Sequence, residues 1–202
     1  MIDTEIRSED FLTQGRDDAR SDISDCGVSV SASRDGDLSI QFTIAECSIG
    51  SILIATTGKG ICAILIEDAP DALLRDLSNR FPEADITRCD GGLERLAAEI
   101  VDLVENPAQA FDRPLDLHGT DFQKDVWRAL RQIPVGTTQS YSEIAARIGL
   151  SREAYAVSEA CAANMIAIAI PCHRVIRKDG TLSGYRWGFK RKRALLKREG
   201  AI

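Results

Sequence analysis

Near its C-terminal end the chain reads Ala167-Ile168-Ala169-Ile170-Pro171-Cys172-His173-Arg174-Val175-Ile176, two apolar runs joined by a short polar step. Pro171 has a fixed φ angle and biases Ile170 toward an extended conformation. A thiolate is a far better nucleophile than a thiol, and an imidazole can relay a proton away from the sulfur. The stretch therefore predicts a reactive Cys172–His173 pair, connected through a bent loop or a bridging water because adjacent side chains on extended backbone point apart. The alternative is a structural cysteine beside a capping histidine, since free cysteines are among the most buried residues.

Four further motifs flank this stretch. In chain order they are Ser140-Tyr141-Ser142-Glu143-Ile144-Ala145, Ala160-Cys161-Ala162-Ala163-Asn164, Asp179-Gly180-Thr181-Leu182-Ser183-Gly184-Tyr185-Arg186-Trp187-Gly188 and Leu195-Leu196-Lys197-Arg198-Glu199. Together with Pro171-Cys172-His173-Arg174-Val175, they resemble the DNA repair alkyltransferases that remove alkyl groups from O6 of guanine, Ada-type proteins among them. The resemblance covers roughly residues 38 to 201. It implies a DNA repair enzyme that moves a methyl or small alkyl group from O6 of guanine to Cys172, with O4 of thymine as a second candidate position.

The resemblance also implies a role for each matching side chain. Cys172 would be the nucleophile and the final alkyl acceptor, and His173 the proton relay, oriented and charged by Glu199. Tyr141 would donate a proton to the guanine ring as the alkyl bond breaks. Asn164 would be the turn residue whose amide satisfies exposed backbone groups. A thioether is chemically inert, so the protein is expected to act once, without a cofactor.

The same resemblance assigns residues to the pocket and to the DNA surface. Gly184, Tyr185 and Arg186 form the loop that walls the base pocket, and Val175 and Lys192 complete the predicted substrate-binding set. For the run 190–193 that contains Lys192, a solvated helix face is the alternative. The resemblance implies double-stranded DNA, bound through the minor groove, as the partner, and the target base must leave the stack to be reached.

The predicted DNA-contacting residues are Arg152, Ala154 and Tyr155, and the small side chains of Ala156 and Ala160 also fit a helix in the minor groove. Tyr155 stands where the family usually has an arginine that fills the gap left by the flipped base. Glu153 adds an acid to the same surface. We hypothesise slower base extrusion and weaker DNA affinity, although an aromatic ring can still wedge between base steps.

Charge divides the chain into two unlike halves. The whole chain of 202 residues has a net charge of −6. Residues 1–119 carry 10 Lys+Arg against 24 Asp+Glu, a net of −14, and residues 120–202 carry 15 against 7, a net of +8. A basic C-terminal half is what a catalytic region that contacts phosphates should have.

The predicted fold class is α/β plus all-α. Period-two runs rich in β-branched residues predict strands at 38–46, 51–56, 61–66 and 115–118, with a turn at 57–60. Apolar residues at helical spacing predict helices at 70–81, 92–105, 121–132, 141–148 and 152–163, the last capped by Ser151. We therefore expect an α/β domain at 38–118, ribonuclease H-like by resemblance, and a helical catalytic domain at 119–202. Its helices 141–148 and 152–163 predict a helix-turn-helix.

The remaining segment, residues 1–37, holds ten acids, four arginines and a single aromatic residue. That composition predicts a largely disordered or loosely docked tail. It lacks the zinc-binding cysteine domain that makes full-length Ada a transcriptional activator, so we expect no gene regulation by that route.

No apolar run approaches the length of a membrane span and no apolar signal region opens the chain, which predicts a cytoplasmic protein without a membrane partner. We also expect a monomer. Six widely spaced cysteines predict reduced thiols. No CxxC or CxxH pair occurs, and neither histidine has the spacing of a metal ligand, so no metal site is predicted. The alternatives to a repair enzyme are a module that recognises alkylated DNA without repairing it, an Ada-type transcriptional regulator and, more distantly, a thiol hydrolase.

Overall fold

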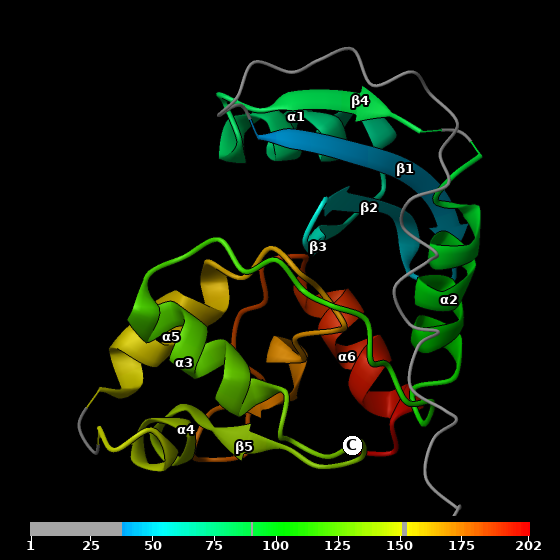
Figure 1. Ribbon diagram of the computed structural model, residues 1–202. Coiled ribbons are helices and arrows are strands. Elements are labelled where there is room, and N and C mark those ends of the chain that lie inside the picture. Colours follow the sequence, from blue (N-terminus) through cyan, green and yellow to red (C-terminus); the bar gives the residue numbers. More distant parts are fainter. Residues whose placement is uncertain (1–37, 90, 151–152) are drawn as a thin grey trace, which may run out of the picture.

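The computed structural model describes residues 38–89, 91–150 and 153–202. The predicted tail of residues 1–37 lies outside the described residues, as do Ser151 and Arg152. Within them the fold is mixed α/β, with a four-stranded sheet followed by a mainly helical part (Figure 1). The predicted class is confirmed at this level. We call residues 39–105 the sheet part and residues 121–198 the helical part.

The sheet has the strand order β3-β2-β1-β4. Its strands are β1 (Ser39–Cys47), β2 (Gly50–Thr57), β3 (Gly60–Glu67) and β4 (Asp85–Arg88). β2 and β3 are antiparallel and buried along almost their whole length, as their isoleucine-rich sequences require, and the three strands predicted here are confirmed. β4, which pairs in parallel with β1, was not predicted, because its four mostly exposed residues show no apolar alternation.

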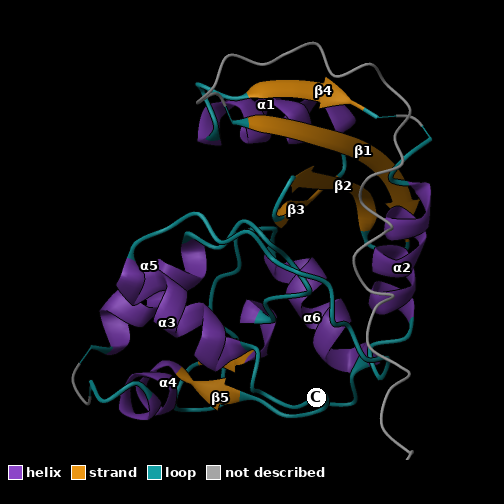
Figure 2. Cartoon of the chain, in the orientation of Figure 1, coloured by secondary structure: helices purple, strands orange, loops and turns teal. Residues whose placement is uncertain are grey.

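Two helices pack on this sheet (Figure 2). α1 (Pro70–Arg80) packs on β2 and β3 and buries Leu73 and Leu77. α2 (Glu94–Glu105) packs on β1, and it begins two residues after the predicted start. Both helices were predicted from the spacing of their apolar residues, so the local pattern was sufficient here.

The helical part holds four α-helices and one 3₁₀ helix among the described residues. These are α3 (Asp121–Leu130), α4 (Tyr141–Arg147), α5 (Ala154–Ala162), η1 (Cys172–Arg174) and α6 (Phe189–Arg198). Capping boxes start α3 and α4: Thr120 pairs with Gln123, and Ser140 pairs with Glu143. α5 begins at Ala154 with Glu153 as its N-cap, two residues later than predicted. A two-stranded parallel pair, β5 (Gln139–Ser140) and β6 (Val175–Ile176), was too short to be predicted.

The outer edge of β3 is hydrogen-bonded to the chain that leads into the helical part. Ile61 N donates to Pro114 O at 2.9 Å, and a Cβ on Gly60 would lie 2.4 Å from that same oxygen, so the approach requires glycine. The strand predicted at 115–118 is reduced to one bridge, between Ile61 and Leu115. The prediction of a strand is wrong because only this short contact reaches the sheet.

The segment that leads to Cys172 is hydrogen-bonded to the same edge of β3. Ile64 N donates to Met165 O at 2.8 Å, and Ala167 N donates to Ile64 O at 2.9 Å. The chain then turns, and Ile168 adopts φ 67°, which is unfavourable for a β-branched residue. The apolar run at 167–170 therefore forms turns and not an extended strand. The chain must leave the sheet edge here and still bury its isoleucines.

The cysteines are mostly as predicted. Cys47, Cys62, Cys161 and Cys172 are free thiols. Cys89 is disulfide-bonded, so the prediction of reduced thiols is wrong at that position. Spacing along the sequence does not decide which cysteines the fold brings together.

Candidate functional site

Cys172 is the first residue of η1, and only 5% of it is exposed. Its backbone N–H donates to Ile170 O at 2.8 Å, which closes the turn after Pro171. Burial raises the pKa of the thiol to about 11, although hydrogen bonding from Asn164 and the nearby Lys192 charge oppose the rise. At neutral pH the resting group is therefore a thiol, and a base must take its proton before it can attack.

Asn164 follows α5 and is fully buried. Its Oδ1 accepts from Ile166 N at 2.9 Å, and its Nδ2 lies 3.1 Å from Ile170 O and 3.3 Å from Cys172 Sγ. One amide thus holds the turn before the nucleophile and touches the sulfur itself. Asn164 therefore lies in the turn that leads to Cys172, and its role in the reaction stays a prediction.

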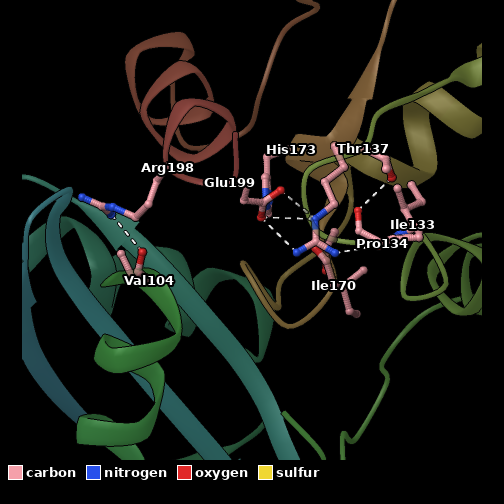
Figure 3. Close-up of polar contacts among 10 residues, drawn as sticks. Val104, Ile133, Pro134, Thr137, Ile170, His173, Arg198 and Glu199 are labelled. Carbon is pink, nitrogen blue, oxygen red and sulfur yellow. Dashed lines mark hydrogen bonds and ion pairs between the residues drawn. The ribbon is translucent and has the colours of Figure 1, made fainter. Parts of the chain in front are cut away.

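His173 and Glu199 form a buried pair between η1 and the end of α6 (Figure 3). His173 Nε2 lies 2.8 Å from Glu199 Oε1, and 1% and 3% of the two side chains are exposed. Burial would raise the pKa of Glu199, but hydrogen bonds from His173 and Arg174 lower it to about 2. An ionised carboxylate only accepts, so Nε2 carries the hydrogen and Nδ1 keeps its lone pair. Burial lowers the pKa of His173, which keeps the imidazole neutral and able to act as a base.

Arg174 completes this group, and no role was predicted for it. Its guanidinium donates to both Glu199 oxygens at 2.9–3.2 Å and to Ile133 O at 2.7 Å. The arginine therefore links the end of α6 to the chain after α3. Its place next to Cys172-His173 was the only signal for it in the sequence.

A second group of hydrogen bonds lies near Cys172 and connects Tyr141 to Lys192 through Ser183. Tyr141 OH donates to Ser183 Oγ at 2.7 Å, and Lys192 Nζ donates to the same oxygen at 2.8 Å. Ser183 Oγ donates in turn to Val175 O at 3.2 Å, which also accepts from Lys192 Nζ. The Val175 side chain is buried in the core, so Val175 contributes its backbone carbonyl to this group of hydrogen bonds. Ser183 lies in the quoted loop motif but was not singled out.

Lys192 is fully buried, although the residues on either side of it lie nearer the surface. The alternative of a solvated helix face is therefore wrong for this residue. Burial lowers the pKa of its ammonium to about 8, despite the opposing influence of Cys172 and Cys161. The helix periodicity turns one position of the basic run inward, which composition alone does not reveal.

The predicted pocket loop is held from two sides. The Tyr185 ring contacts the rings of His173 and Trp187, with centroids 6.3 Å and 5.2 Å away. Arg186 donates to both carboxylate oxygens of Asp76 on α1 at 2.9 Å. The Arg186 side chain is thus directed to the sheet part, and Gly184 is exposed at the loop surface.

The predicted DNA-contacting residues lie at the start of α5. Tyr155 is 79% exposed and Ala154 is half-buried, whereas Arg152 lies outside the described residues. Ala160 is 1% exposed, and its carbonyl accepts from Trp127 Nε1 at 2.8 Å. Ala160 is therefore a packing residue between α3 and α5, which contradicts the expectation that its small side chain faces the minor groove.

Some of the basic charge of the helical part is paired with acids of the sheet part. Among residues 38–89, 91–150 and 153–202, the ion pairs of this kind are Arg186–Asp76, Arg191–Asp68 and Arg198–Glu105. Arg198 also donates to Val104 O at 2.9 Å, which joins α6 to α2 (Figure 3). The contrast in charge between the two halves therefore contributes to their contact as well as to any DNA surface.

This geometry has relatives among known proteins. A family model described as 6-O-methylguanine DNA methyltransferase, DNA binding domain, matches residues 121–201. The methylated-DNA–protein-cysteine methyltransferase of Methanosarcina barkeri is 40% identical over 160 residues, which span 79% of this chain and 97% of that protein. The chain belongs to the methylated-DNA–protein-cysteine methyltransferase family.

Two further relatives define the extent of this similarity. The bifunctional transcriptional activator/DNA repair enzyme Ada of Escherichia coli is 46% identical over 162 residues, covering 80% of this chain and 46% of that protein. The chain thus spans about half the length of Ada. A crystal structure of Mycobacterium tuberculosis OGT in complex with DNA has 35% identity and a TM-score of 0.68, covering 81% of this chain and 93% of that one. This member of the methylated-DNA–protein-cysteine methyltransferase family has, in its described residues, no helix long and apolar enough to cross a bilayer.

Proposed function

We propose that this chain repairs DNA by moving a methyl or small alkyl group from O6 of guanine to Cys172, once per molecule. The observation that carries the proposal is the buried constellation around one free thiol. Asn164 holds Cys172 Sγ, and the next residue, His173, has Nε2 committed to Glu199. Family membership supports the same reaction.

The proposed chemistry starts from a thiol that must lose its proton. His173 Nδ1 takes that proton, directly or through a water, and Glu199 stabilises the imidazolium that forms. Cys172 Sγ then bonds to the alkyl carbon while the bond from that carbon to O6 breaks. Tyr141 gives its hydroxyl proton to the guanine ring, which makes guanine a better leaving group. The product is a thioether on Cys172 and an unmodified guanine, and no group described here could regenerate the thiol.

We further propose how the chain meets DNA. The sheet part would belong to a ribonuclease H-like domain at 38–118, and the helical domain at 119–202 would carry α4 and α5 as a helix-turn-helix. The packing of α4 on α5 and the exposure of Tyr155 at the start of α5 support this. In this proposal α5 enters the minor groove, the target base is flipped, and Gly184 and Tyr185 wall its pocket. The chain would act as a monomer in the cytoplasm, where it can reach DNA.

The direct test is the intact mass of the protein after incubation with duplex DNA that contains O6-methylguanine, followed by peptide mapping. A gain of one methylene on the peptide that contains Cys172 is expected, and Cys172→Ala should gain none. Cys161→Ala is the matched control, because it removes the other free thiol of the helical part and should leave the gain intact. Retained binding without a mass gain would instead indicate a module that only recognises damage. If the protein shows no binding to the damaged duplex and no mass gain, that result would contradict both the repair enzyme and the recognition module.

A further inference from the structure

Ser183 occupies a junction between two groups that are distant in sequence. Its hydroxyl oxygen accepts from Tyr141 on α4 and from Lys192 on α6, at 2.7 Å and 2.8 Å. Ser183 is 6% exposed and Lys192 is fully buried, so solvent has little access to the connection. In the described residues, this hydroxyl is the group that joins the tyrosine to a cation.

The hydroxyl hydrogen of Ser183 has a second place to go. It now points to Val175 O at 3.2 Å, but that carbonyl also accepts from Lys192 Nζ. If the hydrogen turned from Val175 O to the Tyr141 oxygen, the carbonyl would keep a donor. This rotation of the hydroxyl would leave no buried acceptor unpaired. An unpaired buried acceptor is the cost that normally prevents such a rotation.

We propose that Ser183 is a positioning residue that connects Lys192 to Tyr141, so that the lysine replaces the proton which the tyrosine gives to guanine. The inference rests on the proposed alkyl transfer. As Sγ of Cys172 bonds to the alkyl carbon and the bond to O6 breaks, the Tyr141 proton passes to a guanine ring nitrogen. The Ser183 proton passes to the Tyr141 oxygen, and a Lys192 proton passes to the Ser183 oxygen. Lys192 ends neutral, and no oxidant or reductant is needed.

The surroundings of Lys192 fit a proton donor. Burial lowers its pKa first of all, Arg177 lowers it further, and the Cys172 and Cys161 thiols oppose this when they ionise. His173 is also close enough for Lys192 to lower the histidine pKa. The result is an ammonium with a pKa of about 8, which holds its proton at neutral pH but releases it far more readily than an exposed lysine. As pH rises through 8 the relay should lose its proton source.

The test compares single-turnover transfer rates of the wild-type protein and Ser183→Ala from about pH 6.5 to about 9.5, with O6-methylguanine duplex. The ratio of the two rates cancels the ionisation of Cys172 and His173, which both proteins share. The wild-type rate divided by the Ser183→Ala rate should be about 10 below pH 8, because the variant lacks the relay. Above pH 8 this ratio should approach one. Ser183→Thr, which keeps the hydroxyl, should restore the wild-type profile.

Two more variants separate a relay from simple support. Ser158→Ala removes a different hydroxyl, which lowers the Tyr141 pKa but does not belong to the Tyr141–Ser183–Lys192 connection, so the ratio of its rate to the wild-type rate should not change with pH. Ser183→Gly should repeat the Ser183→Ala profile and serves as the second hydroxyl-free variant if the first loses its thermal transition. A ratio that stays constant with pH for both Ser183 variants, or equals one throughout, overturns the relay alone. If the wild-type protein takes no methyl group, the proposed function fails and the relay fails with it.

Discussion

His173 and Glu199 meet across 26 residues of sequence, with Nε2 2.8 Å from Oε1. Glu199 is the C-cap of α6, and the same carboxylate accepts from Arg174. This one contact fixes the tautomer of the proposed base, and it ties the last helix to the residues that follow the nucleophile.

The change Glu199→Gln should slow alkyl transfer by a factor on the order of 100, because a neutral amide cannot stabilise the imidazolium. It also leaves the largely buried Arg174 guanidinium without its charged partner, which should cost about 3 kcal/mol of stability. Single-turnover rates and chemical denaturation measure the two effects. Glu105→Gln is the matched control, since Glu105 and its partner Arg198 form an ion pair at the surface. This substitution should cost less than about 1 kcal/mol of stability. Equal losses in the two variants would contradict the role of Glu199.

The stability of the fold should fall in acid through the same pair. The pKa of Glu199 is about 2 in the folded protein against 4.5 as an unperturbed group, so its contribution is complete above pH 4.5 and is lost between 4.5 and 2. The pKa of His173 is also lowered, from 6.5, so the unfolded state binds its proton first and stability begins to fall below pH 6.5. Melting temperature against pH measures this. In Glu199→Gln the fall between 4.5 and 2 should be shallower, and an unchanged slope would count against the assignment.

Asn164→Ala should destabilise the fold by roughly 1–3 kcal/mol, because it leaves Ile166 N buried without its acceptor and takes one of two donors from Ile170 O, which keeps the Cys172 N–H. The pKa of the Cys172 thiol should rise further, since Asn164 is a group that lowers it. Denaturation and the pH dependence of thiol alkylation measure these effects. Asn106→Ala, at the exposed end of α2, is the control and should change neither quantity by a comparable amount.

Tyr155→Arg should tighten DNA binding and speed transfer, because it adds a cation at an exposed position in the first turn of α5. The slope of log affinity against log salt should steepen by about one. Leu74→Arg adds the same charge to an exposed position on α1 and should leave the transfer rate unchanged. The hypothesis about Tyr155 is wrong if its substitution alters neither affinity nor rate.

Asp76→Asn should cost less than about 1 kcal/mol, because its bridge to Arg186 is partly exposed. The loop at 184–186 should nevertheless exchange its amide hydrogens faster, since Arg186 would lose its anchor on the sheet part. Hydrogen exchange measures this at the loop. Asp125→Asn removes an exposed pair with Arg128 and should leave the loop unchanged. Unchanged exchange in Asp76→Asn would show that the bridge does not hold the loop.

Much of the fold follows from local pattern. The period-two runs of β1 to β3 and the apolar spacing of α1 to α4 predict these elements to within a few residues, because each buries a face that its own sequence defines. The capping boxes at Thr120 and Ser140 would have fixed two helix starts as well. β4 and the two-residue strands escape such reasoning, since their pairing depends on neighbours and not on their own residues.

The candidate site divides in the same way. The sequence alone determined that Cys172 and His173 are adjacent and lie between apolar runs, and its motifs determined which residues to compare with the family. Tertiary structure alone decided that Glu199 reaches His173, that Lys192 turns inward and that Ser183 joins it to Tyr141 across 42 residues. The physical reason is that periodicity fixes the face on which a side chain lies, whereas its partner depends on which faces pack together. Here α6 packs on η1, and the sheet edge at Ile64 holds the turn that presents Cys172.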